Sequence, residues 1–282
     1  MSTTPLSPEL SPKTFDLSIE RGVATITLNR PDKLNSLTFE SYKELAATFA
    51  ALNDVEEARS VVITGTGRGF CSGGDQLDII AELFARDMQG LVEFTRITGR
   101  LIQNIRTLRR PVIAAVNGIA VGAGAVIAAA CDMRIATAKA RFGFIFPKVG
   151  LCGADMGATY LLPKIVGLGN ASEILFLGDL VQSDHALRIG LVNRVVETPE
   201  ECVALAQEWA AKLAQGPAFA NAMTKQMLES EAHMPLADAI EAEAQVQAIC
   251  MQHPDFRTAH EAFKNKETPV FAGAADVGAV KR

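Results

Sequence analysis

The strongest constraint on the fold is an alternation of short apolar runs with helical patterns between about residues 14 and 145. Two alternating runs flank the dipeptide "RG" and predict a hairpin over residues 14–30. Strand-like runs follow at residues 59–64, 112–116 and 132–136, with amphipathic helical patterns at 38–52 and 91–108. Because helices between strands serve as crossover connections, this order predicts an α/β fold with parallel strands.

The second half of the chain changes character and is dominated by helical patterns. Helices are predicted at residues 199–214, 217–229, 236–252 and 253–263, after a strand-like "GLVNRVV" at 190–196. We expect a disordered lead-in over residues 1–13, an α/β core over 14–197, a helical region over 198–271 and a loose tail over 272–282.

Composition argues against several classes of protein. The 282 residues carry a net charge of −5, so the chain lacks the basic excess typical of nucleic-acid binding. The longest apolar run, residues 112–131, contains Asn117 and three glycines, which favours a buried strand, turn and helix over a membrane span. The five cysteines are scattered, so we expect free thiols, no metal site and no disulfide framework. Without a signal-like N-terminus, the expected location is the cytoplasm.

Two glycine clusters lie at the ends of strand-like runs: "GFCSGGDQ" at residues 69–76 and "NGIAVGAGAV" at 117–126. The second leads into an alanine-rich helical pattern. Such turns let backbone N–H groups approach a ligand, and a helix N-terminus adds its positive dipole end. The pattern is typical of an oxyanion hole or a phosphate site, and tight turns without chemistry are the alternative. Neither cluster matches the P-loop or the dinucleotide-binding fingerprint.

These clusters are part of a longer series of segments that resembles the crotonase, or enoyl-CoA hydratase/isomerase, superfamily. The resemblance covers about residues 15–271 and includes, in order, "LNRPDKLNSL", "VVITGTGRGFCSGGDQ", "RRPVIAAVNGIAVGAGAVIAAACDMRIA", "RFGF", "LLPKIVG", "GLVNRVV" and "EAFKNKETPVF". It implies a crotonase-like spiral of ββα units with a helical C-terminal trimerisation region. It also implies an acyl-CoA thioester as substrate, no cofactor beyond the coenzyme A of that substrate, and a homotrimer or homohexamer.

The resemblance also implies roles for individual residues. Gly74 and Ala123 match the two backbone donors of the family's oxyanion hole. The residues that match coenzyme A contacts or flank the same groove are Lys33, Leu34, Ser36, Gly73, Gln76 and Lys266. Lys266 corresponds to the first residue of a basic pair in the family, and Glu267 replaces the arginine of that pair.

Acid–base residues decide the reaction within this superfamily, and the two glutamates of its hydratase branch are absent here. Their positions hold Val126 and Phe146. By resemblance, Asp155 lies where several isomerase branches carry an acid. One carboxylate beside a stabilised enolate suffices to move a proton between two carbons. We therefore favour an isomerase with Asp155 as its acid/base, and we expect an apolar pocket that includes Phe144 to raise the pKa of Asp155.

The residues leave alternatives open. The local sequence also fits Asp155 as the N-cap of the next helix. A hydratase, or a C–C bond hydrolase or lyase, could use the same carboxylate, with Glu82 or Asp78 as a second acid. A non-catalytic acyl-CoA-binding protein that has lost its glutamates is the alternative outside enzymes. A bulky or cyclic acyl group is suggested by the apolar residues Val126, Phe144, Phe146 and Leu151.

Overall fold

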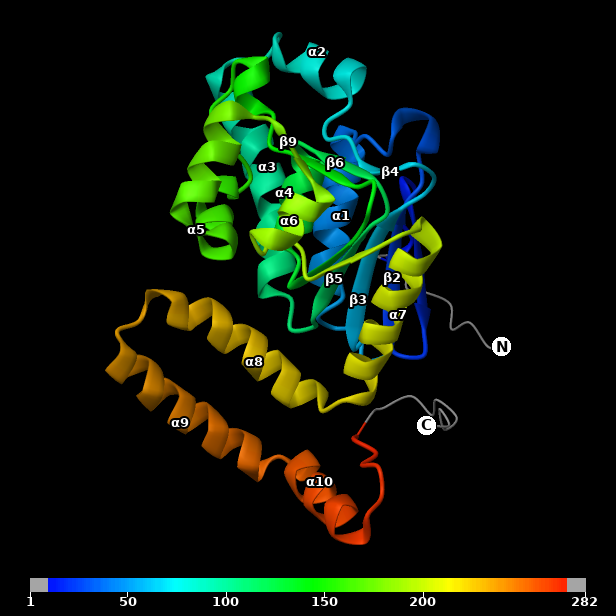
Figure 1. The fold of residues 1–282 in the computed structure, drawn as a ribbon, viewed down its shortest axis with the longest axis vertical. Coiled ribbons are helices and arrows are strands. Elements are labelled where there is room, and N and C mark those ends of the chain that lie inside the picture. The colour runs from blue at the N-terminus through cyan, green and yellow to red at the C-terminus, as the bar shows by residue number, and fades with distance from the viewer. Residues whose placement is uncertain (1–9, 273–282) are drawn as a thin grey trace.

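The computed structural model describes residues 10–272, which are built around a six-stranded sheet (Figure 1). The strand order is β1-β2-β3-β5-β7-β10. β1 and β2 form the predicted antiparallel hairpin, and every other neighbouring pair is parallel, as the sequence indicated. The strands are β1 (Phe15–Glu20), β2 (Val23–Leu28), β3 (Ser60–Gly65), β5 (Val112–Val116), β7 (Met133–Thr137) and β10 (Arg194–Val196).

A second, smaller sheet follows the carboxyl ends of three of these strands. Its order is β4-β6-β8-β9, from β4 (Gly69–Cys71), β6 (Ile119–Val121), β8 (Arg141–Gly143) and β9 (Leu180–Gln182). β3, β5 and β7 each continue into a strand of this second sheet, and a helix follows each pair. This repeated path is the spiral of ββα units that the family resemblance implied.

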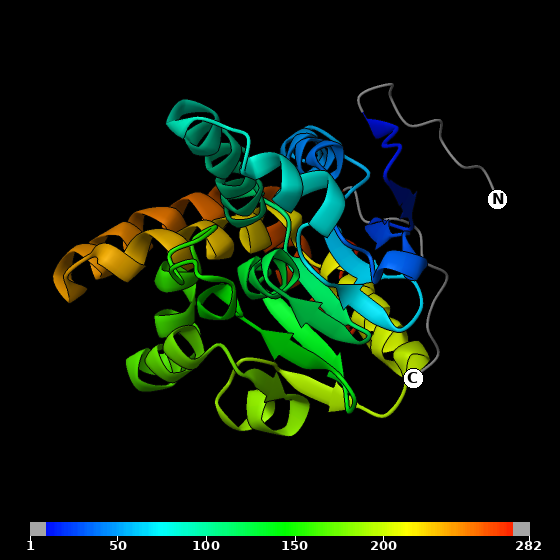
Figure 2. The ribbon, with the colours of Figure 1, turned by 90° about the horizontal axis from the view of Figure 1, so that it is seen from above.

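Helices cover both faces of the large sheet (Figure 2). α1 (Phe39–Ala51), α3 (Met88–Thr107), α4 (Ala123–Ala130) and α5 (Ala158–Leu177) share the main core with residues such as Ile26 and Ile63. α7 (Pro199–Gln215) packs on the other face through Ala206 and Ala210, against Val62 and its neighbours. The intermediate segments are η2 (Pro31–Lys33), η3 (Gln76–Ile80), α2 (Ala81–Leu83), η4 (Phe146–Val149) and α6 (Ser183–Arg188).

Local capping explains where two of these helices begin. The Thr38 side chain accepts a hydrogen bond from the Ser41 N–H and starts α1 at the predicted place. Thr198 and Glu201 form a reciprocal capping box at the start of α7. These bonds lie within four residues, so sequence patterns predict them well.

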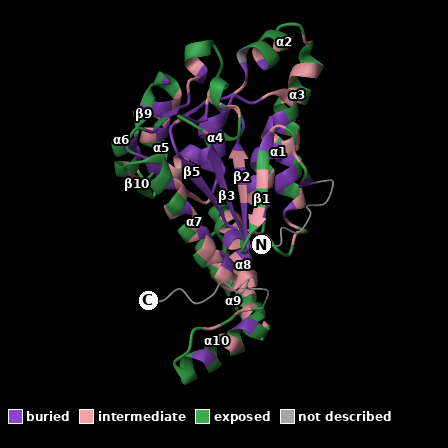
Figure 3. Cartoon of the chain, turned by 90° about the vertical axis from the view of Figure 1, so that its right-hand side faces the viewer, coloured by how far each residue is buried: buried purple, intermediate pink, exposed green. Residues whose placement is uncertain are grey.

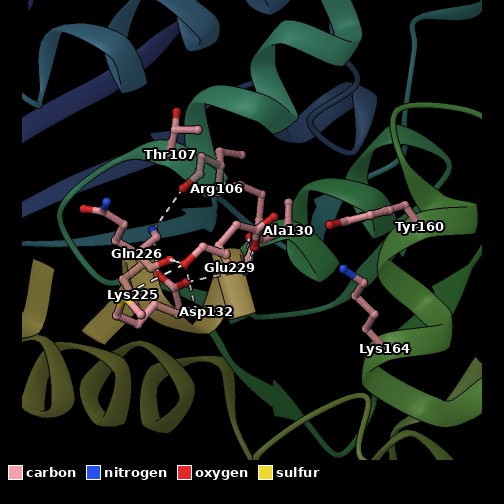
Figure 4. A network of polar contacts seen from close by, with 12 residues as sticks. Arg106, Thr107, Ala130, Asp132, Tyr160, Lys164, Lys225, Gln226 and Glu229 are labelled. Atoms are coloured by element: carbon pink, nitrogen blue, oxygen red, sulfur yellow. Dashed lines mark hydrogen bonds and ion pairs between the residues drawn. The ribbon is translucent and has the colours of Figure 1, made fainter. Parts of the chain in front are cut away.

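The last helices extend away from the sheets (Figures 1 and 3). α8 (Ala218–Ser230), α9 (Leu236–Gln252) and α10 (Pro254–Asn265) lie close to their predicted bounds, with the 3-10 turn η5 (Glu231–His233) after α8. They expose several large apolar side chains: Leu228, Leu236, Ile240, Ile249, Phe256 and Phe263. A partly buried ion-pair network joins α8 to the core (Figure 4). In it, the Lys225 ammonium lies 2.7 Å from the Asp132 carboxylate, and Arg106 pairs with Glu229.

The described residues cover only part of the predicted N-terminal lead-in and C-terminal tail. Residues 1–9 and 273–282, which include most of the expected lead-in and tail, lie outside the described range. Within the range, the Lys13 N–H donates to the Glu44 carboxylate at 3.0 Å. No helix in residues 10–272 is long and apolar enough to cross a membrane.

Candidate active site

The two glycine clusters of the sequence meet where β4 and β6 end. Gly73 has φ 93, a conformation that side chains disfavour. A β-carbon added to Gly73 would lie 3.0 Å from the Val121 carbonyl oxygen and 3.6 Å from the Ala123 nitrogen. One added to Gly124 would lie 2.2 Å from the Cys71 carbonyl oxygen. The missing side chains therefore allow the two turns to lie against each other.

Each turn presents one backbone N–H without a protein acceptor. The Leu37 N–H donates to the Gly73 carbonyl at 2.8 Å, and the Asp75 N–H donates to the Leu37 carbonyl at 2.8 Å. In this parallel bridge, the N–H of the intervening Gly74 points to the opposite side. Ala123 is the first residue of α4, so its N–H has no partner within the helix. Within residues 10–272, neither N–H donates to a protein atom.

The segment predicted to contact coenzyme A packs beside the first turn. The Ser72 N–H donates to the Leu34 carbonyl at 3.0 Å, and the Ser72 hydroxyl donates to the Lys33 carbonyl at 3.2 Å. Leu34 and Asn35 both have positive φ, and Asn35 holds this bend by donating to the Gly69 carbonyl at 2.8 Å. The Lys33 side chain is exposed, whereas Ser36 is buried. The structure thus brings Lys33, Leu34 and Ser36 next to Gly73.

Of the other two predicted contacts, one lies far from this group within the chain and the other has no described side chain. Lys266 ends α10, at the end of the molecule opposite α2 (Figure 1). Gln76 begins η3, and its side chain lies outside the described part of the structure. The candidate second acids are both exposed: Glu82 pairs with Arg86, and Asp78 accepts the Phe39 N–H.

Asp155 does not cap a helix, so the N-cap interpretation of this residue is wrong. The N-cap of α5 is Gly157, and no side chain caps that end. The Ala158 N–H donates instead to the backbone carbonyl of Asp155, at 2.9 Å. Met156 and Gly157 both have positive φ, at 49° and 86°, and this double bend separates Asp155 from the helix. Burial raises the pKa of Asp155, as expected, and the Met156 N–H opposes the shift in part.

The apolar residues predicted to line the acyl pocket are not equally accessible. Phe146 is buried with 5% of its surface exposed. Val126 and Phe144 are 0% exposed and belong to the main core. In this conformation Val126 therefore offers no surface to an acyl group, because α4 packs it inside. Leu151, by contrast, is exposed.

Tyr42 is a residue of this site that the sequence pattern did not single out. It lies on the buried face of α1, 3% exposed, with its ring edge-on to Phe94 at 5.9 Å. Burial raises the pKa of Tyr42 well above its ordinary value, and electrostatic interactions with Cys71 and Asp155 raise it further. The periodicity of α1 assigns Tyr42 to the core, and only the fold places it in the electrostatic range of Asp155.

Comparisons with known proteins agree with this fold. The family model described as enoyl-CoA hydratase/isomerase matches residues 18–274. The chain is 35% identical over 257 residues to 1,2-epoxyphenylacetyl-CoA isomerase of Escherichia coli K12, covering 90% of this chain and 97% of that protein. It is also 35% identical over 252 residues to short-chain-enoyl-CoA hydratase of Clostridium acetobutylicum, covering 89% and 94%.

A crystal structure from Streptomyces coelicolor A3(2), provisionally described as an enoyl-CoA hydratase, superposes with a TM-score of 0.91. It is 45% identical and covers 97% of this chain and 98% of its own. The fold is thus that of the crotonase superfamily, whose members act on acyl-CoA thioesters. The chain belongs to the enoyl-CoA hydratase/isomerase family.

Proposed function

We propose that this family member is an acyl-CoA isomerase that uses a single carboxylate. Gly74 and Ala123 donate their N–H groups to the thioester oxygen, and Asp155 moves the proton. The observation that carries this proposal is the state of Asp155, a partly buried carboxylate with a raised pKa that caps no helix. The two positions that hold glutamates in the hydratase branch carry Val126 and Phe146, which cannot exchange protons.

The proposed reaction conserves every atom of the acyl group. The Asp155 carboxylate takes a proton from a carbon next to the thioester or conjugated with it. The electron pair of that C–H bond moves to the thioester oxygen, where two N–H donors and the N-terminus of α4 stabilise the enolate. The carboxylic acid then returns the proton to a different carbon, and the double bond shifts. A raised pKa suits both steps, because the group must accept a proton and then release one. While it is on Asp155 the proton can exchange with solvent.

Solvent exchange tests this proposal directly. The protein is incubated in heavy water with crotonyl, 3-enoyl, dienoyl and arylacetyl-CoA, and deuterium at the α- and γ-carbons is measured by mass spectrometry. We expect incorporation together with a shifted double bond, and the loss of both in Asp155→Asn. Asp184→Asn is the matched control, because Asp184 forms an exposed ion pair with Arg188 on α6. Acyl-CoA binding without exchange on any substrate would contradict isomerisation and support a binding protein.

Hydration is the second candidate, because the similarity to the C. acetobutylicum hydratase equals that to the E. coli isomerase. In that case Asp155 would activate a water molecule, and the acyl-CoA product in the same samples would be heavier by one water molecule. A C–C hydrolase or lyase would instead release a shorter acyl-CoA or a free acid. Mass spectrometry of the products separates these three reactions in one experiment.

We also propose that the protein assembles into a homotrimer or homohexamer through its helical region. A groove of about 520 Å³ lies among α8, α9 and α10, and its wall includes Met223, Val246 and Phe256. Exposed apolar side chains gathered on one region, as on these helices, are typical of a surface that another protein buries. Lys266 lies far from the other predicted coenzyme A contacts of its own chain. In the assembly it would contact the coenzyme A that a neighbouring copy binds. Sedimentation equilibrium measures the assembly, and a monomer at micromolar concentration would contradict it.

The proposed location is the cytoplasm, and the proposed reaction needs no cofactor beyond coenzyme A. Cys71, Cys131 and Cys202 are free thiols, and burial raises the pKa of each to about 12. Thiols in this state suit a reducing compartment. Cell fractionation tests the location, and activity after dialysis against a chelator tests the cofactor requirement.

A further inference from the structure

The Asp75 side chain, which the proposed reaction does not use, binds two segments of the site at once. One carboxylate oxygen accepts from the Ser36 hydroxyl at 3.0 Å and from the Arg30 guanidinium at 3.1 Å. The other accepts from the N–H groups of Leu77 and Asp78 at 3.0 and 3.3 Å. The side chain is only 9% exposed. A single carboxylate thus joins the segment of residues 30–37 to the start of η3.

Backbone bonds extend this connection to the turn that carries Gly74. The Arg30 guanidinium also donates to the Ser36 carbonyl at 2.7 Å, which holds the 30–37 segment in its bend. The next residue, Leu37, bonds on one side to the Gly73 carbonyl and on the other to the Asp75 N–H. The orientation of the Gly74 N–H therefore depends on the position of the 30–37 segment, because Gly74 has no side chain of its own to hold it.

The charge of Asp75 is permanent over the range in which enzymes work. Burial alone would raise its pKa, but the Leu77 and Asp78 N–H groups, the Ser36 hydroxyl and Arg30 lower the pKa to about 2. A carboxylate with this pKa does not exchange protons near neutrality. Its contribution is positional, in contrast to that of Asp155, whose pKa is raised.

We propose that Asp75, together with Arg30 and Ser36, is a positioning device that couples the coenzyme A-binding segment to the Gly74 oxyanion donor. Displacing the 30–37 segment would turn the Gly74 N–H away from the thioester oxygen. Correct seating of the coenzyme A portion would in turn orient that donor. The inference rests on the proposed function, since it takes the thioester carbonyl as the ligand of Gly74. It assigns Asp75 no contact with the substrate.

The test measures the hydrogen bond to the carbonyl separately from turnover. Butyryl-CoA labelled with ¹³C at the thioester carbon is bound to the purified full chain, and its carbonyl band is recorded by infrared difference spectroscopy. Hydrogen bonds from an oxyanion hole move this band to lower frequency. In Asp75→Asn we expect at least half of the wild-type shift to be lost, and α-proton exchange to slow by about 100-fold, as when one oxyanion donor is removed.

The pH profile distinguishes positioning from proton transfer. In Asp75→Asn we expect the rate of exchange to fall at every pH without a change in the apparent pKa of the profile. Asp184→Asn again serves as control, because it removes a charge from an exposed Asp–Arg pair and should change neither readout. If Asp75→Asn does not fold by circular dichroism, Ser36→Ala removes only one of the bonds. It should give a smaller loss of the same band shift.

The outcomes also separate this inference from the proposed function. If the wild-type protein shifts the carbonyl band but does not exchange protons, isomerisation is contradicted. The band shifts of the variants then still test the positioning role. No band shift or no binding in the wild type would overturn the positioning role together with the oxyanion assignment. If Asp75→Asn keeps the band shift and the exchange rate of the wild-type protein, the positioning role alone is overturned. The same holds for Ser36→Ala where that variant is needed.

Discussion

Replacing Gly73 with alanine should damage both stability and catalysis, because two independent features exclude a side chain there. The residue has φ 93, and an added β-carbon would lie 3.0 Å from the Val121 carbonyl oxygen and 3.6 Å from the Ala123 nitrogen. Ordinary contacts of a carbon atom lie at about 3.5–4.0 Å. The turn must therefore shift, and both candidate oxyanion donors adjoin the displaced atoms.

The magnitude follows from these two features. A side chain at positive φ costs about 1–2 kcal/mol, and the forced contact adds about 1–3 kcal/mol. The free energy of unfolding should therefore fall by about 2–5 kcal/mol. Displacing one oxyanion donor should slow proton exchange by about 100- to 1,000-fold.

Urea unfolding and the heavy-water exchange assay measure the two effects on one preparation. Gly99→Ala is the matched control, because Gly99 lies inside α3 and an added β-carbon meets nothing within 4 Å. That variant should gain about 0.5–1 kcal/mol of stability through helix propensity and keep its exchange rate. A Gly73→Ala protein with wild-type stability and wild-type exchange would refute the reasoning about the turn.

The remaining predictions concern charge. The rate of exchange should rise with pH and level off above an apparent pKa that is higher than the ordinary 3.8 of an aspartate. A pH–rate profile with an apparent pKa of 3.8 or lower would contradict the assignment of Asp155. Because folding lowers the pKa of Asp75 from 3.8 to about 2, its contribution to stability is complete above the unfolded value and is lost as pH falls towards 2. Asp75→Asn should remove that part of the acid sensitivity in unfolding titrations. Lys225→Ala removes the nearer of the two cations beside the partly buried Asp132 and leaves Arg106 at 3.5 Å. It should destabilise the fold by about 1–3 kcal/mol in urea unfolding, and an unchanged midpoint would contradict this. Dialysis against a chelator should leave exchange unchanged, and recovery only on adding a metal would contradict the proposed reaction.

Elements held by local interactions were predictable from the residues alone. α9 has the predicted bounds, Leu236–Gln252, and α1 begins where the Thr38 cap indicated. The strands β4, β6, β8 and β9 have three residues each, which is too short for a hydrophobic period to show. The second sheet was therefore accessible only through the family resemblance.

Assignments that depend on direction or distance could not be made in the same way. The local sequence of Asp155 fits a helix N-cap, and only the left-handed bend at Met156 and Gly157 excludes it. Val126 is the last residue of the second glycine cluster, yet it points from α4 into the core. Tyr42 follows the apolar period of α1, and its proximity to Asp155 arises from segments more than a hundred residues apart.

By itself, the sequence determined the α/β class, the order of the elements and the two glycine turns, because each depends on interactions between near neighbours in the chain. The sequence also gives the residues at the two positions that the resemblance matches to the hydratase glutamates, Val126 and Phe146. The tertiary structure alone decided that the two turns meet, that Asp155 caps no helix and that Asp75 joins two segments of the site. These relations depend on how distant segments pack, and packing is set by the whole core rather than by any local pattern.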